Sequence, residues 1–452
     1  METKSLEVPK RQRLLLVPCP YQGHINPMLH LATFLHQNGF AITVAHTFFN
    51  SLNPHHHPDF TFLRLNDRLS DDLVTSSDVA SVLLAINHNC RAGLEEALAA
   101  AVGDIVCVIH DELMYFCEAV ASGFGVRSMV VRTTTAAACI SRLAVLQLQA
   151  ENRLPLLHGS IEDEVPNLHP LRFKDLPFSA FSETSKMAQI ILNIYTITTS
   201  SAVIWNTIPW LEPSELTQIK AKFCKKVPIF PIAPIHKISP ISSSSSLLNE
   251  DSTCLPWLHK QPPNSVIYVS LGSIALLTNQ QLLEMAWGLA NSKQPFLWVV
   301  RPGSVQGSGG TEFVSKEFQE KVGDRGCIVE WAPQKEVLGH RAVGGFWSHC
   351  GWNSTLESLS EGVPMLCRPY SGDQKVNSRY ISCVWRVGLA LEGHELKRKE
   401  VEMGIRKLMV EEEGRRMRER AMDFKRRIED CLREDGSSSL HLKELVDFVM
   451  SF

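Results

Sequence analysis

The sequence predicts an α/β protein of two Rossmann-like domains, each a doubly wound parallel sheet, that face each other across a cleft. The 452-residue length exceeds what one hydrophobic core usually supports. Short apolar strands alternate with helical patterns in both halves, which is typical of parallel sheets, and a serine-rich stretch separates the halves. We therefore expect an N-terminal domain at 1–235, a linker at 236–252, a C-terminal domain at 253–435 and a final helix at 436–452.

The N-terminal half begins with a strand, a loop and a helix. Residues 13–19 are mostly apolar, and PYQGH follows them as a loop. Asn26 is predicted to cap the helix, with Pro27 at its first position, and Gly39 is predicted to end it. Further strands are expected at 40–46, 105–110 and 126–132.

The residue composition changes between the two halves, where the chain becomes rich in serine. The run HKISPISSSSSLLNED has too little apolar surface to order itself strongly, so we expect a linker there. Strand and helix alternation restarts with a β-branched strand at 265–271 that leads into Gly272 and Ser273. The remaining strands of this half are expected at 296–300, 327–330, 343–347 and 365–367, and an amphipathic helix near 438–452.

Composition excludes several classes of partner. A net charge of -3 gives no electrostatic reason for nucleic acid or an anionic membrane to bind. No apolar run is long enough to span a membrane and no secretory signal stands out, so the twelve cysteines are expected as reduced thiols in a cytoplasmic protein. There is no CxxC pair and no Cys/His cluster with zinc spacing, so we expect no metal. The first strand is not followed by GxGxxG, which argues against a nicotinamide oxidoreductase.

Residues 331–374 carry the groups that a nucleotide sugar requires. The motif HCGWNS follows an apolar strand and opens a helix, whose free N–H groups and positive dipole suit a diphosphate. Gly351 allows the backbone to approach closely because it has no Cβ. Glu357 lies four residues after Asn353, on the same face of the helix, where a carboxylate can accept hydrogen bonds from a ribose diol. Trp331 offers an aromatic plane for stacking a base.

This segment, together with PYQGHINPM, PNLHPLRFKDLP and YVSLGS, resembles the plant UDP-dependent glycosyltransferases over nearly the full chain. The resemblance implies the GT-B arrangement of two domains and a UDP-sugar donor. In that family a Gln at position 374, rather than a His, is associated with UDP-glucose. The resemblance places Trp331 on uracil, Gln334 and Glu357 on ribose, Ser273, His349, Asn353 and Ser354 at the phosphates, and Trp352, Asp373 and Gln374 near the sugar, with Ala332 as a further donor contact.

A candidate general base lies in the other half. His24 is in the loop after the first strand, at the sheet edge where open α/β folds bind ligands, and imidazole titrates near neutral pH. Asp111 ends the strand IVCVIH and is the natural partner to orient His24; Glu112 is adjacent and competes for that role, and the family pattern favours Asp111. Thr133 and Thr134 match positions that the family uses near the sugar.

These features predict an inverting glucosyltransferase that acts as a monomer without metal or cofactor. It would move glucose from UDP-glucose to a hydroxyl, carboxyl or nitrogen of a small plant metabolite or hormone. Two alternatives stay open: another donor (UDP-galactose, UDP-xylose or UDP-glucuronate), or a catalytically silent metabolite-binding protein. The acceptor itself is not predicted, although residues 135–205 are expected to shape its pocket.

Overall fold

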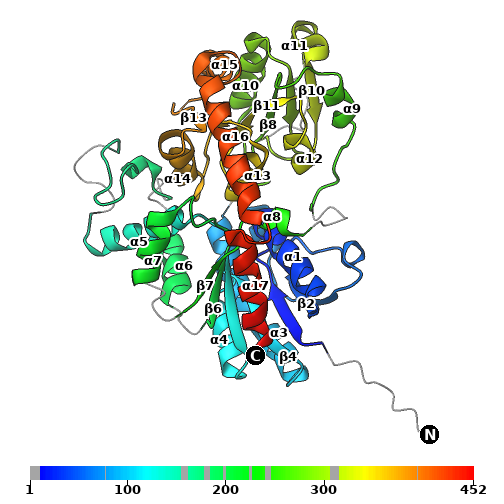
Figure 1. Ribbon diagram of the computed structural model, residues 1–452, viewed down its shortest axis with the longest axis vertical. Coiled ribbons are helices and arrows are strands. Elements are labelled where there is room, and N and C mark those ends of the chain that lie inside the picture. The colour runs from blue at the N-terminus through cyan, green and yellow to red at the C-terminus, as the bar shows by residue number, and fades with distance from the viewer. Residues whose placement is uncertain are drawn as a thin grey trace.

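The computed structural model contains two α/β domains placed end to end, with the last two helices running from one domain to the other (Figure 1). The residues that the structure describes are 11–76, 78–153, 161–177, 184–196, 200–222, 227–239, 246–305, 315–393 and 395–452. No helix within these ranges combines the length and apolarity needed to cross a membrane.

Both domains are built on a parallel sheet whose strand order reverses beside the first strand. The N-terminal sheet has the order β3-β2-β1-β4-β5-β6-β7, and the C-terminal sheet has the order β10-β9-β8-β11-β12-β13. Every pairing within the two sheets is parallel. The N-terminal strands are β1 (Arg13–Val17), β2 (Ala41–Thr47), β3 (Thr61–Leu65), β4 (Ile105–Asp111), β5 (Arg127–Arg132), β6 (Ala202–Trp205) and β7 (Ile229–Pro231). The C-terminal strands are β8 (Val266–Ser270), β9 (Phe296–Val299), β10 (Gly326–Val329), β11 (Val343–Ser348), β12 (Met365–Cys367) and β13 (Gly388–Ala390).

The helices lie between successive strands and cover both faces of each sheet, as parallel connections require (Figure 1). The N-terminal domain has α1 (Gln22–Gln37), α2 (Asp71–Thr75), α3 (Val79–Ala100), α4 (Phe116–Gly123), α5 (Ala136–Ala150), α6 (Thr184–Thr196), α7 (Pro213–Lys222) and α8 (Ile235–Ile238). The remaining helices are α9 (Cys254–His259), α10 (Asn279–Ser292), α11 (Lys316–Val322), α12 (Gln334–Leu338), α13 (Trp352–Glu361), α14 (Gln374–Arg379), α15 (Arg398–Met409), α16 (Glu412–Leu432) and α17 (Ser437–Met450). The predicted fold class and each predicted strand are confirmed, the strands to within two residues at either end.

Helix α1 begins earlier than the sequence predicted. Asn26 is not its cap: the backbone N–H groups of His24 and Ile25 already donate to the carbonyl of Tyr21, at 2.8 and 2.9 Å. Pro27 therefore lies inside the helix. Because proline has no N–H, the carbonyl of Gly23, four residues before it, loses its helical partner. The helix tolerates this loss because that carbonyl is satisfied from outside.

The described ends of the predicted linker are ordered. Ile235 is buried in the short helix α8, which packs against α1. The backbone N–H of Leu247 donates to Gln22 Oε1 at 2.6 Å, and that of Asp251 donates to the carbonyl of Trp331 at 2.8 Å. Most of the serine run, which spans 242–246, lies outside the described residues. Backbone groups at both described ends of this stretch therefore bond to the two domains, and the linker assignment itself stays a prediction.

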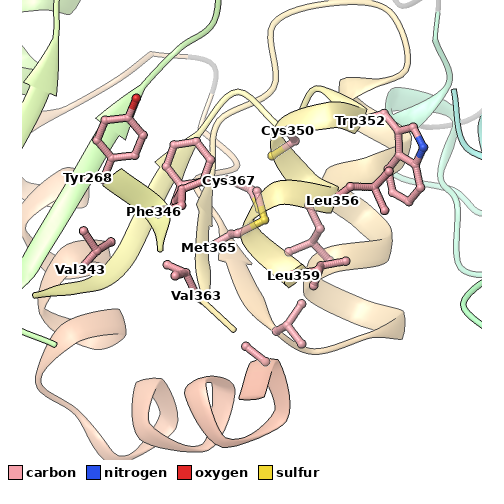
Figure 2. Close-up of a cluster of buried hydrophobic side chains, with 14 of the residues drawn as sticks. Tyr268, Val343, Phe346, Cys350, Trp352, Leu356, Leu359, Val363, Met365 and Cys367 are labelled. Carbon is pink, nitrogen blue, oxygen red and sulfur yellow. The ribbon is translucent and has the colours of Figure 1, made fainter. Parts of the chain in front are cut away.

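One hydrophobic cluster is shared by the two domains. It combines C-terminal residues such as Phe346 and Leu356 with Ala137, Ile208 and Leu211 of the N-terminal domain. Figure 2 shows its C-terminal part, where the side chains fill the space between β11, β12 and α13. A continuous core of this kind fixes the two sheets relative to each other, because opening it would expose apolar surface to water.

Helix α17 returns to the N-terminal domain and completes that domain's core. Leu442, Leu445 and Val449 belong to the same buried cluster as Leu14 and Phe230 of the N-terminal sheet. Figure 1 shows the helix, in red, lying along this domain after α16 has descended from the other. The chain end is therefore part of the N-terminal fold.

This packing gives a direct stability test. Leu445 is fully buried, whereas Leu440 on the same helix is 47% exposed. Leu445→Ala should lower the free energy of unfolding by about 2–5 kcal/mol, because it leaves a cavity in the core. Leu440→Ala is the matched control and should change it by less than about 0.5 kcal/mol. Urea unfolding followed by circular dichroism measures both; equal effects would mean that α17 does not contribute to the core.

Candidate active site

The polar groups predicted from the sequence gather where the carboxyl ends of both sheets face each other. On the N-terminal side, His24 follows β1, Asp111 ends β4 and Thr133 follows β5. On the C-terminal side, His349 follows β11 and Asp373 precedes α14. Parallel sheets bind ligands at this edge because all their strands end there, so the two edges together form one site.

His24 and Asp111 form a hydrogen-bonded pair. Nδ1 of His24, in the first turn of α1, lies 2.8 Å from Oδ2 of Asp111. The Asp111 side chain is fully buried, and its other oxygen accepts the backbone N–H of Leu113 at 2.9 Å. A carboxylate held in this way keeps the proton of the imidazole on Nδ1. The lone pair on Nε2 is then available to accept a proton, as in catalytic triads.

The electrostatic environment of His24 favours its charged form. Burial by itself would lower the pKa of His24, but the charge of Asp111 and the hydrogen bond to it outweigh burial. Smaller contributions from Glu112 and Asp373 act in the same direction, so the pKa of His24 is raised above its usual value. A base with a raised pKa binds the acceptor's proton more firmly.

Glu112 has a different role. Its carboxylate is buried and bonds to Arg142 Nη1 at 2.8 Å and to Arg132 Nη1 at 3.2 Å. Arg132 in turn stacks over Trp205, 5.2 Å from the ring centroid. Both oxygens of Glu112 are therefore occupied by arginines. The geometry assigns Asp111, and not Glu112, as the partner of His24.

The two threonines predicted near the sugar are turned toward other partners. The hydroxyl of Thr133 lies 2.9 Å from Nδ1 of His24, so it belongs to the surroundings of the base. The hydroxyl of Thr134 donates to Asp373 Oδ2 at 3.2 Å, across the domain interface. Both side chains are buried. Thr134 thus holds a residue that was predicted to hold the sugar.

The ribose groups predicted from the sequence lie together. Nε2 of Gln334, the first residue of α12, donates to Glu357 Oε2 at 2.6 Å and to Ser354 Oγ at 2.9 Å. Ser354 was predicted at the phosphates, but here its hydroxyl is engaged by Gln334. Burial raises the pKa of Glu357, although the bond from Gln334 lowers it in part. Trp331, three residues before Gln334, is half-buried.

The predicted phosphate site consists of a helix start and a buried histidine. Helix α13 begins at Trp352 with Gly351 as its cap. The imidazole of His349 lies between two glycines: a Cβ on Gly272 would come within 2.7 Å of it, and one on Gly351 within 2.4 Å. Burial lowers the pKa of His349 to about 4, so the ring is neutral at pH 7. Its Nδ1 has no partner among the described residues, and Ser273 directly follows Gly272.

Cys350 is strained where the strand turns into this helix. Its φ of 65° lies in the left-handed region, which side chains with a Cβ rarely adopt. The hydroxyl of Ser348 accepts the N–H of Cys350 at 3.0 Å, and Nδ2 of Asn377 donates to its carbonyl at 2.9 Å. Backbone strain held by surrounding bonds is typical of functional sites, and here it lies directly before the start of α13.

Asn353 links the donor side to the base. Its Nδ2 donates to the carbonyl of Gly23 at 2.5 Å, the carbonyl that Pro27 left without a helical partner. Its Oδ1 accepts from Nδ2 of Asn206 at 3.3 Å. Asn353 was predicted at the phosphates. In the structure its amide donates to the carbonyl of the residue that precedes His24. One hydrogen bond therefore connects the start of α13 to the chain segment that carries His24.

The indole of Trp352 packs into the shared core, whereas the resemblance placed this residue near the sugar. The side chain is 3% exposed, and its Nε1 donates to the carbonyl of Asn206 at 2.6 Å. Figure 2 shows the ring on the first turn of α13, at the edge of the buried cluster. Since the indole N–H is already bonded, Trp352 can contact a UDP-sugar only through its backbone N–H at the helix start. Ala332 is likewise buried, so its backbone alone can contact a ligand.

Asp373 and Gln374, which the resemblance placed near the sugar, cap and begin α14. The carboxylate of Asp373 accepts from Thr134 and from Asn377 Nδ2, both at 3.2 Å. Oε1 of Gln374 accepts the backbone N–H groups of Tyr370 at 2.8 Å and Ser371 at 3.0 Å. A glutamine amide can both donate and accept hydrogen bonds. Since its oxygen is occupied, Nε2 alone remains to donate to a sugar.

Sequence reasoning missed Asn206. This buried residue directly follows β6, and it bonds to both Trp352 and Asn353. A polar residue after an apolar strand was a usable signal, because β6 ends at the same sheet edge as β1 and β4. Among the described residues one group of metal-type ligands is also present, formed by Cys19, His24 and Asp111.

Comparisons with known proteins point to one family. The family described as UDP-glucoronosyl and UDP-glucosyl transferase matches residues 162–428. A flavonol 3-O-glucosyltransferase of Arabidopsis thaliana, UGT76E12, is 45% identical over an alignment of 452 positions that covers 98% of each chain. UDP-glycosyltransferase 76E1 of Solanum lycopersicum is 44% identical over 98% of this chain and 94% of its own length.

Solved structures show the same architecture. A Polygonum tinctorium UDP-glucosyltransferase capable of glucosylating indoxyl superposes with a TM-score of 0.84 at 27% identity, over 98% of this chain and 100% of its own. Os79 of O. sativa, in complex with UDP, superposes with a TM-score of 0.79 at 27% identity, over 96% of this chain and 100% of its own. The fold is therefore GT-B. With the family match and relatives of this identity along its whole length, the chain belongs to the plant UDP-glycosyltransferases.

Proposed function

We propose that this protein is a cytosolic glucosyltransferase that moves glucose from UDP-glucose to a small plant metabolite or hormone, with inversion at the anomeric carbon. The observation that carries the proposal is the bond between Asn353, in the first turn of α13, and Gly23, which precedes His24. It sets the base, already oriented by Asp111, directly opposite the helix start that suits a diphosphate.

His24 and Asp111 perform the proton transfer. Nε2 of His24 takes the proton of an acceptor hydroxyl as its oxygen attacks the anomeric carbon of α-linked UDP-glucose from the face opposite UDP. The imidazolium that forms is stabilised by the buried carboxylate of Asp111 at Nδ1. The sugar bond to UDP breaks as the new bond forms, so the product is a β-glucoside and no covalent enzyme intermediate arises.

The departing diphosphate is stabilised without a metal ion. The N–H groups at the start of α13 present a positive dipole end to it. His349 is neutral at its lowered pKa, so it contributes a hydrogen bond and not a full charge. Because these groups are fixed in a desolvated site, they need little reorganisation when charge develops on UDP.

Glucose is the proposed sugar. Gln374 is free to donate from Nε2, and Asp373 presents a carboxylate beside it that accepts hydroxyl hydrogens. The Arabidopsis relative named a flavonol 3-O-glucosyltransferase supports both glucose as the donor sugar and a phenolic hydroxyl as the first acceptor to test. Carboxyl and nitrogen acceptors belong in the same panel. UDP release with UDP-glucose and these acceptors tests the proposal, and its absence with all of them would favour a silent binding protein.

The base is tested by His24→Ala. Turnover with an alcohol acceptor should fall at least about a hundredfold, in line with general-base contributions of about 10²–10⁴. Affinity for UDP should change little, because the donor groups lie mainly in the other domain. His88→Ala, an exposed histidine on α3, is the matched control and should leave turnover intact. Near-normal turnover of the His24 variant with several alcohols would exclude this base.

The pH profile tests the pairing with Asp111. Activity requires neutral His24, so kcat/KM should fall as pH decreases through the pKa of His24, which lies above its usual value near 6.5. Asp111→Asn removes the charge that raises this pKa. The acid limb should therefore move to lower pH, and the maximal rate should drop because imidazolium loses its stabiliser. If the acid limb stays at the same pH in Asp111→Asn, then titration of the His24–Asp111 pair does not cause it.

Donor selectivity tests Asp373 and Gln374. Each buried hydrogen bond lost to a sugar hydroxyl costs about 1–3 kcal/mol, so Asp373→Ala should lower kcat/KM for UDP-glucose by about fivefold to somewhat more than a hundredfold. Gln374→Ala should weaken it less. Gln374→His should reduce glucose transfer and admit more galactose, whose 4-hydroxyl is axial. Affinity for UDP, which lacks the sugar, is the control and should stay unchanged. Intact values for both alanine variants would place the sugar elsewhere.

A further inference from the structure

Cys19 places a thiol beside the catalytic pair. It ends the turn after β1, five residues before His24, and its side chain is fully buried. One ligand atom each from Cys19, His24 and Asp111 lie within 4.8 Å of one another. The spacing of these residues in the sequence does not reveal the group, because Cys19 and His24 follow β1 whereas Asp111 is at the end of β4. Neither the proton transfer proposed above nor the donor site uses the thiol.

We propose that this group is an inhibitory site for a thiophilic divalent cation such as Zn²⁺, bound by Cys19 Sγ, His24 Nδ1 and Asp111 Oδ2. The proposal rests on the proposed role of His24 as the base. The three ligand types are those that zinc takes in proteins, and three protein ligands with one open position is its usual reactive arrangement.

The geometry is close to what the ion needs. Zinc bonds of about 2.0–2.3 Å in a tetrahedron place ligand atoms roughly 3.3–3.8 Å apart. Nδ1 and Oδ2 are now 2.8 Å apart, because a proton and not an ion lies between them. A small separation of this pair and an approach of Sγ by up to about 1 Å would complete the set. The hydroxyl of Thr133, 2.9 Å from Nδ1, lies beside the fourth position.

The charges also balance. A thiolate and a carboxylate neutralise a divalent cation, which removes the main cost of placing it in a buried site. When the ion binds, the thiol gives its proton to solvent, and the proton on Nδ1 is exchanged for one on Nε2 because a neutral imidazole carries only one. The coordinated ring is thus fixed with its hydrogen on Nε2.

This tautomer predicts the mode of inhibition. Nε2 with a hydrogen has no lone pair to receive the acceptor's proton, so the chemical step stops. The ion lies on the side of the imidazole away from the acceptor, and the donor groups are in the other domain. Zn²⁺ should therefore lower kcat and leave KM for both substrates unchanged, and a chelator should restore activity.

Cys19→Ser provides the test, with Cys107→Ser as the matched control. Cys107 is an equally buried thiol in the same sheet, on β4, and it is outside this group. Partners that merely orient a metal ligand are worth about 10–100-fold in affinity, so loss of the direct ligand Cys19 should raise the inhibition constant of Zn²⁺ at least tenfold. Cys107→Ser should leave it unchanged.

A second measurement does not depend on activity. Co²⁺ added to the chelator-treated full-length protein should give a thiolate-to-cobalt absorption band in the near ultraviolet, which Cys19→Ser should remove and Cys107→Ser should keep. If Cys19→Ser loses the band but the wild-type protein transfers sugar to none of the acceptors, the ion site is supported and the proposed function is refuted. An unchanged band or an unchanged inhibition constant in Cys19→Ser would overturn the proposed ion site. Competition between Zn²⁺ and UDP-glucose would also overturn it, because it would show that the ion binds at the UDP-glucose site.

Discussion

The active site depends on the contact between Asn206 and the start of α13. The carbonyl of Asn206 accepts the indole N–H of Trp352, and its amide donates to Asn353, while its own Oδ1 accepts the backbone N–H of Ile235. The bonds from Trp352 and Ile235 are buried, so breaking either one leaves an unpaired polar group inside the protein, at about 1–3 kcal/mol, while the bond to Asn353 is partly buried. The shared hydrophobic cluster holds the domains together, and these directional bonds fix the position in which they meet. Catalysis needs that position, because base and donor come from different sheets.

Pro27 shows how a local rule can be overruled by a distant partner. The rule that proline occupies the first helical position predicted a helix starting after Asn26. The helix in fact starts at Gln22, and the cost of the proline falls on the carbonyl of Gly23. Asn353 supplies the missing donor from the other domain. The misplaced boundary thus coincides with a functional contact, which a single helix pattern could not reveal.

Much of the architecture was predictable because it rests on local patterns. Apolar runs such as 105–110 and 343–347 are buried strands, and the motif HCGWNS predicted a helix start, which falls at Trp352. Side-chain direction was not predictable. Trp352 and Thr133 have the right residue types near the right places, yet the indole packs between domains and the hydroxyl faces His24. These directions depend on residues that are far apart in sequence, and so does the approach of Cys19 to Asp111.

Burial then determines how the site handles charge. It lowers the pKa of His349 and raises that of Glu357, so burial disfavours the charged form of both groups near the start of α13. Burial acts on His24 in the same way as on His349, yet the outcome is opposite, because Asp111 lies 2.8 Å from one ring and no described carboxylate bonds to the other. Two histidines with the same side-chain chemistry thereby have pKa values shifted in opposite directions. His24 gains a proton easily and suits a base, while His349 stays neutral and leaves the developing charge of UDP to the helix dipole.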